Sequence, residues 1–116
     1  MTPKDTDRLA HLRRERERLL RELPTLSCLL RGSLFRRFST CSRPSCPCRK
    51  GARHGPRYLL AVTAKKRQKQ HYVPKSQIRA VRRGVRQYHR LLQILDRLTA
   101  IHLILMRKGC LHEYAQ

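Results

Sequence analysis

The sequence predicts an α+β fold that is mainly helical: a helical hairpin with a small zinc-binding β-meander between its two helices. Two segments, one near each end of the 116-residue chain, carry apolar residues at helical spacing. The segment between them is typical of short strands and holds cysteines and a histidine at metal-ligand spacing. Because a chain of this length has room for only a modest core, we expect one domain over residues 1–116. Its predicted parts are an N-terminal helical part (5–31), a zinc-knuckle β-meander (32–73) and a long basic, amphipathic helix (74–108).

The shorter of the two predicted helices lies in the stretch "DTDRLAHLRRERERLLREL", where leucines recur on one face. Acidic residues stand in its first turn, and we expect Asp5 or Thr6 to cap it. Pro24 has no backbone N–H and restricts the residue before it, so the helix should end near Glu22.

The middle of the chain contains three candidate strands, "SLFRRFS", "PRYLLAVT" and "KQHYVP". The longest helix should then run from Pro74 to Arg107, before Gly109, a length of roughly 50 Å. The last turns of this helix, around Ile101 and Leu105, are apolar on nearly all sides. We therefore expect a protein partner or self-association to cover them.

The charge is strongly basic, with 28 Lys and Arg against 7 Asp and Glu and a net charge of +21. No acid occurs between Leu23 and Leu95, whereas 18 Lys and Arg do. Such a segment cannot neutralise itself, so its expected partner is a polyanion, nucleic acid above all. A helical wheel places six basic residues of the long helix in a sector of about 100°, which indicates contact with phosphates. With only six aromatic residues in the chain, the composition argues against a platform that stacks on single-stranded bases. The predicted nucleic-acid contacts are Arg36, Arg37, Arg43, Arg49, Lys50, Arg53, Arg57, Lys65, Lys66, Arg67, Lys69, Lys75, Arg79, Arg82, Arg83, Arg86 and Arg90.

The stretch "CSRPSCPCRKGARHG" has the spacing C-x4-C-x-C-x5-H. Three cysteines and one histidine form an accepted tetrahedral set for zinc, and the prolines and glycines among them supply sharp turns. We predict one structural Zn2+ bound by Cys41, Cys46, Cys48 and His54, with His71 as the alternative fourth ligand.

Other interpretations of this cysteine and histidine cluster fit less well. A disulfide framework conflicts with an odd number of cysteines and with the reducing compartment expected below. A catalytic thiol lacks a nearby carboxylate or amide to orient its base. A catalytic zinc site usually needs a carboxylate base, and none is near. The chain is therefore not expected to be an enzyme.

The motif "GSLFRRFSTCSRPSCPCRKGARHGPRYLL", followed by "HYVP" and by "YHRLLQILDRL", resembles an uncharacterised family of small prokaryotic proteins. That family has G-S, then C-G-x-x-x-C-x-C, then G-x-x-H-G-P-Y-Y, and is often encoded beside transposases. The resemblance covers roughly residues 9–105. Ser42 stands where glycine is common and Arg57 where the first tyrosine often stands. The resemblance implies a mobile-element context and supplies no activity.

Together these features predict a non-catalytic, zinc-containing nucleic-acid-binding accessory protein of a mobile element, acting on transposon-linked DNA or a ribonucleoprotein. The alternatives are a structural RNA-binding protein of ribosomal type, and an adaptor that binds a transposase or nuclease subunit. The charged N-terminus lacks a signal peptide, and the longest apolar run, "AIHLILM", is too short to span a bilayer. We therefore expect a cytoplasmic protein associated with nucleoid or ribonucleoprotein, with no membrane contact.

Overall fold

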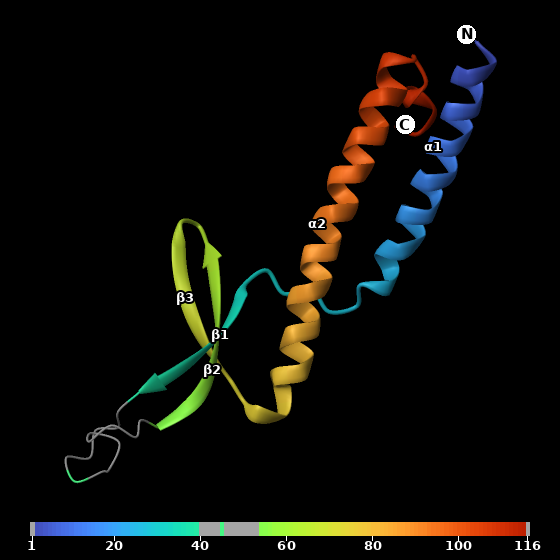
Figure 1. Cartoon of the computed structure of the whole chain (residues 1–116). Helices are drawn as coiled ribbons and strands as arrows, with labels where there is room; N and C mark the ends of the chain where they lie inside the picture. Colours follow the sequence, from blue (N-terminus) through green and yellow to red (C-terminus); the bar gives the residue numbers. More distant parts are fainter. Residues whose placement is uncertain (1, 40–44, 46–53, 116) are drawn as a thin grey trace. The chain divides into compact units, whose positions relative to one another are not determined.

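The computed structural model describes residues 2–39, 45 and 54–115. It contains helix α1 (Pro3–Glu22), helix α2 (Ile78–Arg107) and a three-stranded antiparallel sheet (Figure 1). The predicted α+β class with a helical majority is confirmed. No helix in the described part of the chain is long and apolar enough to cross a membrane.

The chain forms two compact units. The helical unit comprises Met1–Ser27 and His89–Gln116, and the sheet unit comprises Cys28–Tyr88. The division falls inside α2, whose first turns belong to the sheet unit. The single domain predicted over 1–116 stays a prediction.

Helix α1 begins with a capping box at Thr2. The Thr2 hydroxyl accepts a hydrogen bond from the Asp5 amide at 3.2 Å, and the Asp5 carboxylate accepts one from the Thr2 amide at 3.4 Å. Pro3 occupies the first helical position, where its missing N–H costs nothing. The expected cap at Asp5 or Thr6 is therefore wrong, because both residues already lie in the first turn. The predicted end near Glu22 is confirmed.

In the helical unit, α1 and the second half of α2 run antiparallel. Two ion pairs show this: the Arg97 guanidinium donates to Glu15 at 2.7 and 2.8 Å, and Arg90 donates to Glu22 at 2.6 and 2.9 Å. As the residue number rises along α1, that of its partner on α2 falls. The hydrogen bonds from Arg97 and Arg90 hold the pKa values of Glu15 and Glu22 below their ordinary value of 4.5. The carboxylates therefore stay charged, and these pairs weaken only in acid.

The core of the helical unit is made by Leu9 and Leu12 of α1 with Ile101 and Leu105 of α2. Ile101 and Leu105 are 0 % exposed. The chain itself thus covers the two side chains for which the sequence predicted a protein partner. Helix α2 ends at Arg107 as predicted, and Gly109 follows with φ of 77°, a conformation that favours glycine.

The sheet unit contains strands β1 (Ser33–Ser39), β2 (His54–Ala64) and β3 (Arg67–Val73) in the order β1-β2-β3. All three predicted strands and the meander are confirmed, with β2 extending to residues on both sides of the predicted segment. A two-residue turn at Lys65 and Lys66 joins β2 to β3.

One face of the sheet is the packed face. Leu60 and Val73 are both buried and lie on this face, because Val73 pairs with Tyr58, two residues from Leu60 on β2. The Arg82 guanidinium of α2 lies 5.6 Å from the Tyr58 ring centroid, which places the first turns of α2 on the same face. The buried residues Leu60 and Val73 and the Arg82–Tyr58 contact therefore lie on the same face of the sheet.

Gly84 of α2 lets the segment before the sheet lie close to the helix. The Leu30 amide donates to the Gly84 carbonyl at 3.1 Å, and the Cys28 amide donates to the Gln87 side chain at 2.8 Å. A Cβ atom at Gly84 would stand 2.9 Å from Leu30 Cδ1 and 3.2 Å from Cys28 Sγ. Gly84, although a glycine inside a helix costs about 1 kcal/mol relative to alanine, thus has a packing role.

We expect Gly84→Leu to lower the free energy of unfolding by about 2 kcal/mol, the usual cost of overpacking. The measurement is urea unfolding followed by circular dichroism. Ala80→Leu is the matched control, since Ala80 is exposed on the same helix. We expect that control to change stability by less than about 0.5 kcal/mol. Equal stabilities for the two variants would show that the close approach at Gly84 contributes nothing.

Candidate nucleic-acid interface

The two units differ sharply in charge. The sheet unit contains 17 Lys and Arg and no Asp or Glu, so the helical unit holds all seven acids of the chain. The five ion pairs among the described residues all join groups of the helical unit. The helical unit therefore partly neutralises its own charge, whereas the sheet unit needs an external anion to do so.

Four arginines gather on the first turns of α2 and, together with Ala80, line a shallow hollow. All four are exposed, and none forms an ion pair within the described part of the chain. The four are Arg79, Arg82, Arg83 and Arg86. They recur at i, i+3, i+4 and i+7, which is one side of a helix. This geometry suits a run of phosphates, because guanidinium groups donate in a fork that matches phosphate oxygens.

The two ends of the predicted basic sector differ. Lys75 is exposed in a 3-10 turn (Lys75–Gln77) directly before α2. Arg90 instead forms its bidentate pair with Glu22 and belongs to the helical unit. Arg90 thus already has a carboxylate partner within the chain, although the helical wheel placed it in the same sector as the arginines of the hollow.

The β2–β3 turn presents a second basic group. Lys65 and Lys66 have φ of 52° and 63°, so both adopt the left-handed conformation that non-glycine residues seldom take. A shallow hollow beside the turn is lined by Val62, Ala64, Lys65, Arg67, Lys69 and His71. Val62 pairs with Lys69 and Ala64 pairs with Arg67. Both pairs lie on the packed face of the sheet, nearer to the turn than the buried Leu60. The strained turn therefore holds several cations together at the tip of the hairpin.

The remaining predicted basic contacts are divided between the strands and the connection from β1 to β2. Arg36, Arg37 and Arg57 are exposed on the sheet. Arg37 pairs directly with Arg57 across β1 and β2. The other predicted contacts lie outside the described residues: Arg43, Arg49, Lys50 and Arg53.

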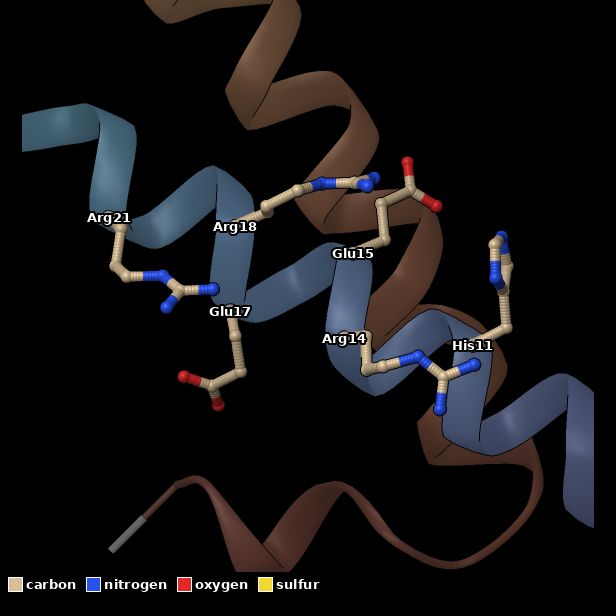
Figure 2. Close-up of a pocket in the computed structure, with 6 residues that line it drawn as sticks. All are labelled: His11, Arg14, Glu15, Glu17, Arg18 and Arg21. Atoms are coloured by element: carbon tan, nitrogen blue, oxygen red, sulfur yellow. The ribbon is translucent and has the colours of Figure 1, made fainter.

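Helix α1 carries a basic stripe that sequence reasoning missed. Figure 2 shows His11, Arg14, Arg18 and Arg21 along α1, with Glu15 and Glu17 beside them. The four basic residues recur at i, i+3, i+7 and i+10, a helical-wheel signal that was present in the sequence. The adjacent carboxylates are already engaged, Glu15 by Arg97 and Glu17 by Arg16. This stripe is a second basic surface, and it belongs to the helical unit.

Three of the four predicted zinc ligands, Cys41, Cys46 and Cys48, lie outside the described residues. The fourth, His54, begins β2, and its backbone pairs with Ser39 at the end of β1. The chain therefore leaves and re-enters the sheet at neighbouring positions. Within residues 2–39, 45 and 54–115, no three His, Cys, Asp or Glu side chains gather as a metal site.

The other two cysteines are free thiols. Cys28 is exposed, although its place among leucines in the sequence is typical of a small core residue, and that interpretation is wrong. Its neighbours explain the difference, because the segment from Cys28 to Leu30 lies along the surface of α2 at Gly84. Cys110 is half-buried beside the core of the helical unit.

A family model described as a domain of unknown function, DUF6788, matches residues 9–83. Comparisons with curated proteins and with solved structures give no match. The matched range begins within α1, includes the whole sheet and ends among the arginines of α2. It therefore contains most of the acid-free sheet unit.

Proposed function

The chain belongs to the DUF6788 family, and we propose that it is a non-catalytic protein that binds nucleic acid through the phosphates. The observation that carries this proposal is the sheet unit's 17 basic residues without a single carboxylate. Phosphate is the abundant anion that an array of guanidinium and ammonium groups recognises. We propose no catalytic role, because the acid-free unit offers no carboxylate to act beside its histidines in general acid or base chemistry.

The arginine hollow on α2 is the proposed primary contact. A helix with a one-sided row of arginines can lie along a phosphate backbone, and such contacts position a protein without reading bases. The hairpin cations around Lys65 and Lys66 are the proposed second contact. The resemblance to small proteins encoded beside transposases favours an accessory role in a mobile element, on its DNA or its ribonucleoprotein.

We also propose that the chain binds one structural zinc ion. Cys41, Cys46, Cys48 and His54 provide three thiolates and one imidazole, a donor set that suits tetrahedral zinc. The pairing of Ser39 with His54 brings the two ends of the donor-bearing segment together. His71 pairs with Leu60, six residues and about 20 Å along β2 from His54, which favours His54 as the fourth ligand.

A second candidate function is an adaptor that binds another protein through α2. Its support is an exposed apolar stripe within the helical unit, made by Leu92, Leu95, Leu103 and Met106. These residues fall within a sector of about 80° on the helical wheel, away from buried Ile101 and Leu105. This stripe, rather than the buried pair, is the surface on which a protein partner or a second copy could dock.

The test is a titration of the full chain against a fluorescent duplex DNA and a structured RNA of equal length at several salt concentrations. We expect log affinity to fall linearly with log salt, with a slope of roughly −4 if four phosphates are engaged on duplex DNA. The ratio of the affinities for duplex DNA and structured RNA distinguishes a DNA-binding protein from an RNA-binding protein of ribosomal type. No binding to either at low salt would overturn the proposal. A protein partner that stays bound to the chain in high salt would favour the adaptor function.

The β2–β3 turn offers a variant that separates strain from charge. We expect Lys65→Asn with Lys66→Gly to raise the free energy of unfolding by about 1 kcal/mol, because Asn-Gly suits two left-handed positions. The same change should flatten the salt slope by about 1 to 2 units. Lys65→Gln with Lys66→Gln is the control, which removes the charge and keeps the strain. Equal salt slopes for wild type and both variants would exclude the turn from the interface.

A further inference from the structure

The face of the sheet opposite the packed face gathers aromatic side chains into a row. Phe35 of β1 pairs with Leu59 of β2, and Leu59 pairs with Tyr72 of β3. Residues paired in this way point to the same side of a sheet, so the three side chains form one line across the strands. Tyr72 is 64 % exposed, and Phe35 and Leu59 are half-buried. We call this line, together with its flanking residues, the open face.

Apart from the small, buried Ala61, two residues from Leu59 on β2, the flanking residues on the open face are cationic or neutral and polar. Arg37 and Arg57 form the next row toward one end, and both are exposed. The Arg37 guanidinium lies 5.9 Å from the Phe35 ring centroid. On β3, Gln68 and Gln70 lie on the same side of the strand as Tyr72, because every second side chain of a strand points to the same face. A hydrophobic protein contact normally has few charges at its centre, so the arginine row beside the rings argues for a different occupant.

Unpaired nucleobases fit each part of this face. A flat base can stack on the exposed ring of Tyr72 or on Phe35, and every base offers such a surface. Adjacent strands lie about 4.8 Å apart, so the two rings are separated by roughly 10 Å with Leu59 between them. That separation accommodates more than one base of an extended strand. Arg37 and Arg57 can hold its phosphates, and the glutamines can donate to and accept from base edges.

We propose that the open face binds a single-stranded nucleic acid, with Tyr72 and Phe35 stacking on its bases and Arg37 and Arg57 on its phosphates. The inference rests on the proposed function and extends it to unpaired strands. It also reverses an expectation from composition, by which six aromatic residues were too few for a stacking platform. Two of the six suffice here, because the strand register places residues 35 and 72 in the same row.

The experiment measures the affinity of the full chain for four probes of equal length. The probes are oligothymidine, oligouridine, an abasic DNA strand that keeps the phosphates, and duplex DNA. We expect Tyr72→Ala to weaken binding to oligothymidine and oligouridine about tenfold, the effect of losing roughly one stacked base. Its affinity for the abasic strand and the duplex should be unchanged, and Tyr72→Phe should bind like wild type. Comparing the thymidine and uridine probes shows whether DNA or RNA is preferred.

Phe38→Ala is the matched control. Phe38 is exposed on β1 and lies outside the row formed by Phe35, Leu59 and Tyr72. We expect this variant to bind all four probes like wild type. Quenching of tyrosine fluorescence by oligothymidine, reduced in Tyr72→Phe, gives a direct readout of stacking.

The outcomes separate this inference from the proposed function. Equal affinity of wild type for oligothymidine and the abasic strand would overturn the open-face proposal and leave phosphate binding intact. Equal losses for Tyr72→Ala on all four probes would also overturn it, because stacking cannot affect a strand without bases. Failure of the wild-type chain to bind any of the four probes would overturn the proposed function itself.

Discussion

Changing Arg79, Arg83 and Arg86 together to glutamine is expected to reduce affinity for duplex DNA by two to three orders of magnitude at about 0.1 M salt. Each phosphate contact contributes about 0.9 to the slope of log affinity against log salt. Removing three contacts should therefore flatten that slope by about 2 to 3 units. All duplex sequences should weaken alike, because phosphate contacts carry no base information.

The choice of these three residues follows from their surroundings. All three are exposed, and none of them forms an ion pair with a described residue. Arg82 lines the same hollow but lies over the Tyr58 ring, so its loss would combine a packing effect with a binding effect. The free energy of unfolding of the triple variant should therefore stay close to that of wild type.

A charge-matched control comes from the α1 stripe. Arg14→Gln, Arg18→Gln and Arg21→Gln together remove the same net charge from the helical unit. If the arginine hollow binds the duplex, this control should keep most of the salt slope. An unchanged slope for the α2 variant on both DNA and RNA would remove the helix from the interface. The arginines between β1 and β2 in the sequence, Arg43, Arg49 and Arg53, would then be the next to test.

The strands and the helix ends could be predicted because their signals are local. Pro24 ends α1 through its own backbone, and the strand predicted at SLFRRFS begins at Ser33, directly after Gly32. The start of α1 was misplaced for an equally local reason. Thr2 and Asp5 form a capping box in which aspartate takes the place usually held by glutamate or glutamine.

The surroundings of individual side chains depend on which distant segments meet. Ile101 and Leu105 have the apolar pattern of an interface, and nothing local shows that Leu9 and Leu12 cover them within the chain. Arg90 and Arg86 are indistinguishable on a helical wheel, yet only Arg90 meets a carboxylate.

The alignment of the aromatic row is likewise not predictable from local sequence. Phe35 and Tyr72 are 37 residues apart, and their alignment depends on the β1–β2 register as well as on the two-residue turn at Lys65 and Lys66. A one-residue change in either register would move one ring to the packed face. Composition counts aromatic residues but carries no information on register, so it could not indicate that two rings would share one row.

Replacing Cys46 with alanine is expected to release one zinc ion per chain and to unfold the β-meander. Metal and folding are coupled at such sites, since the apparent binding free energy of structural zinc is about 10 to 16 kcal/mol in small zinc-binding peptides. The sheet unit has few alternative sources of stability. Only Leu60, Ala61 and Val73 are buried among the described apolar residues of its strands, too few to stabilise a three-stranded sheet strongly.

Elemental analysis of protein purified without chelator measures the metal, and circular dichroism measures the sheet. Cys48→Ala should behave like Cys46→Ala, whereas Cys28→Ala and Cys110→Ala should keep a full zinc content, because neither thiol belongs to the predicted donor set. A wild-type chain without zinc would overturn the metal site, and a halved zinc content in Cys28→Ala would overturn the assignment of its ligands.

His54→Ala and His71→Ala decide the fourth ligand. We expect only the first to lose zinc, because the Ser39–His54 pair ties His54 to the end of the sheet where the cysteine segment begins.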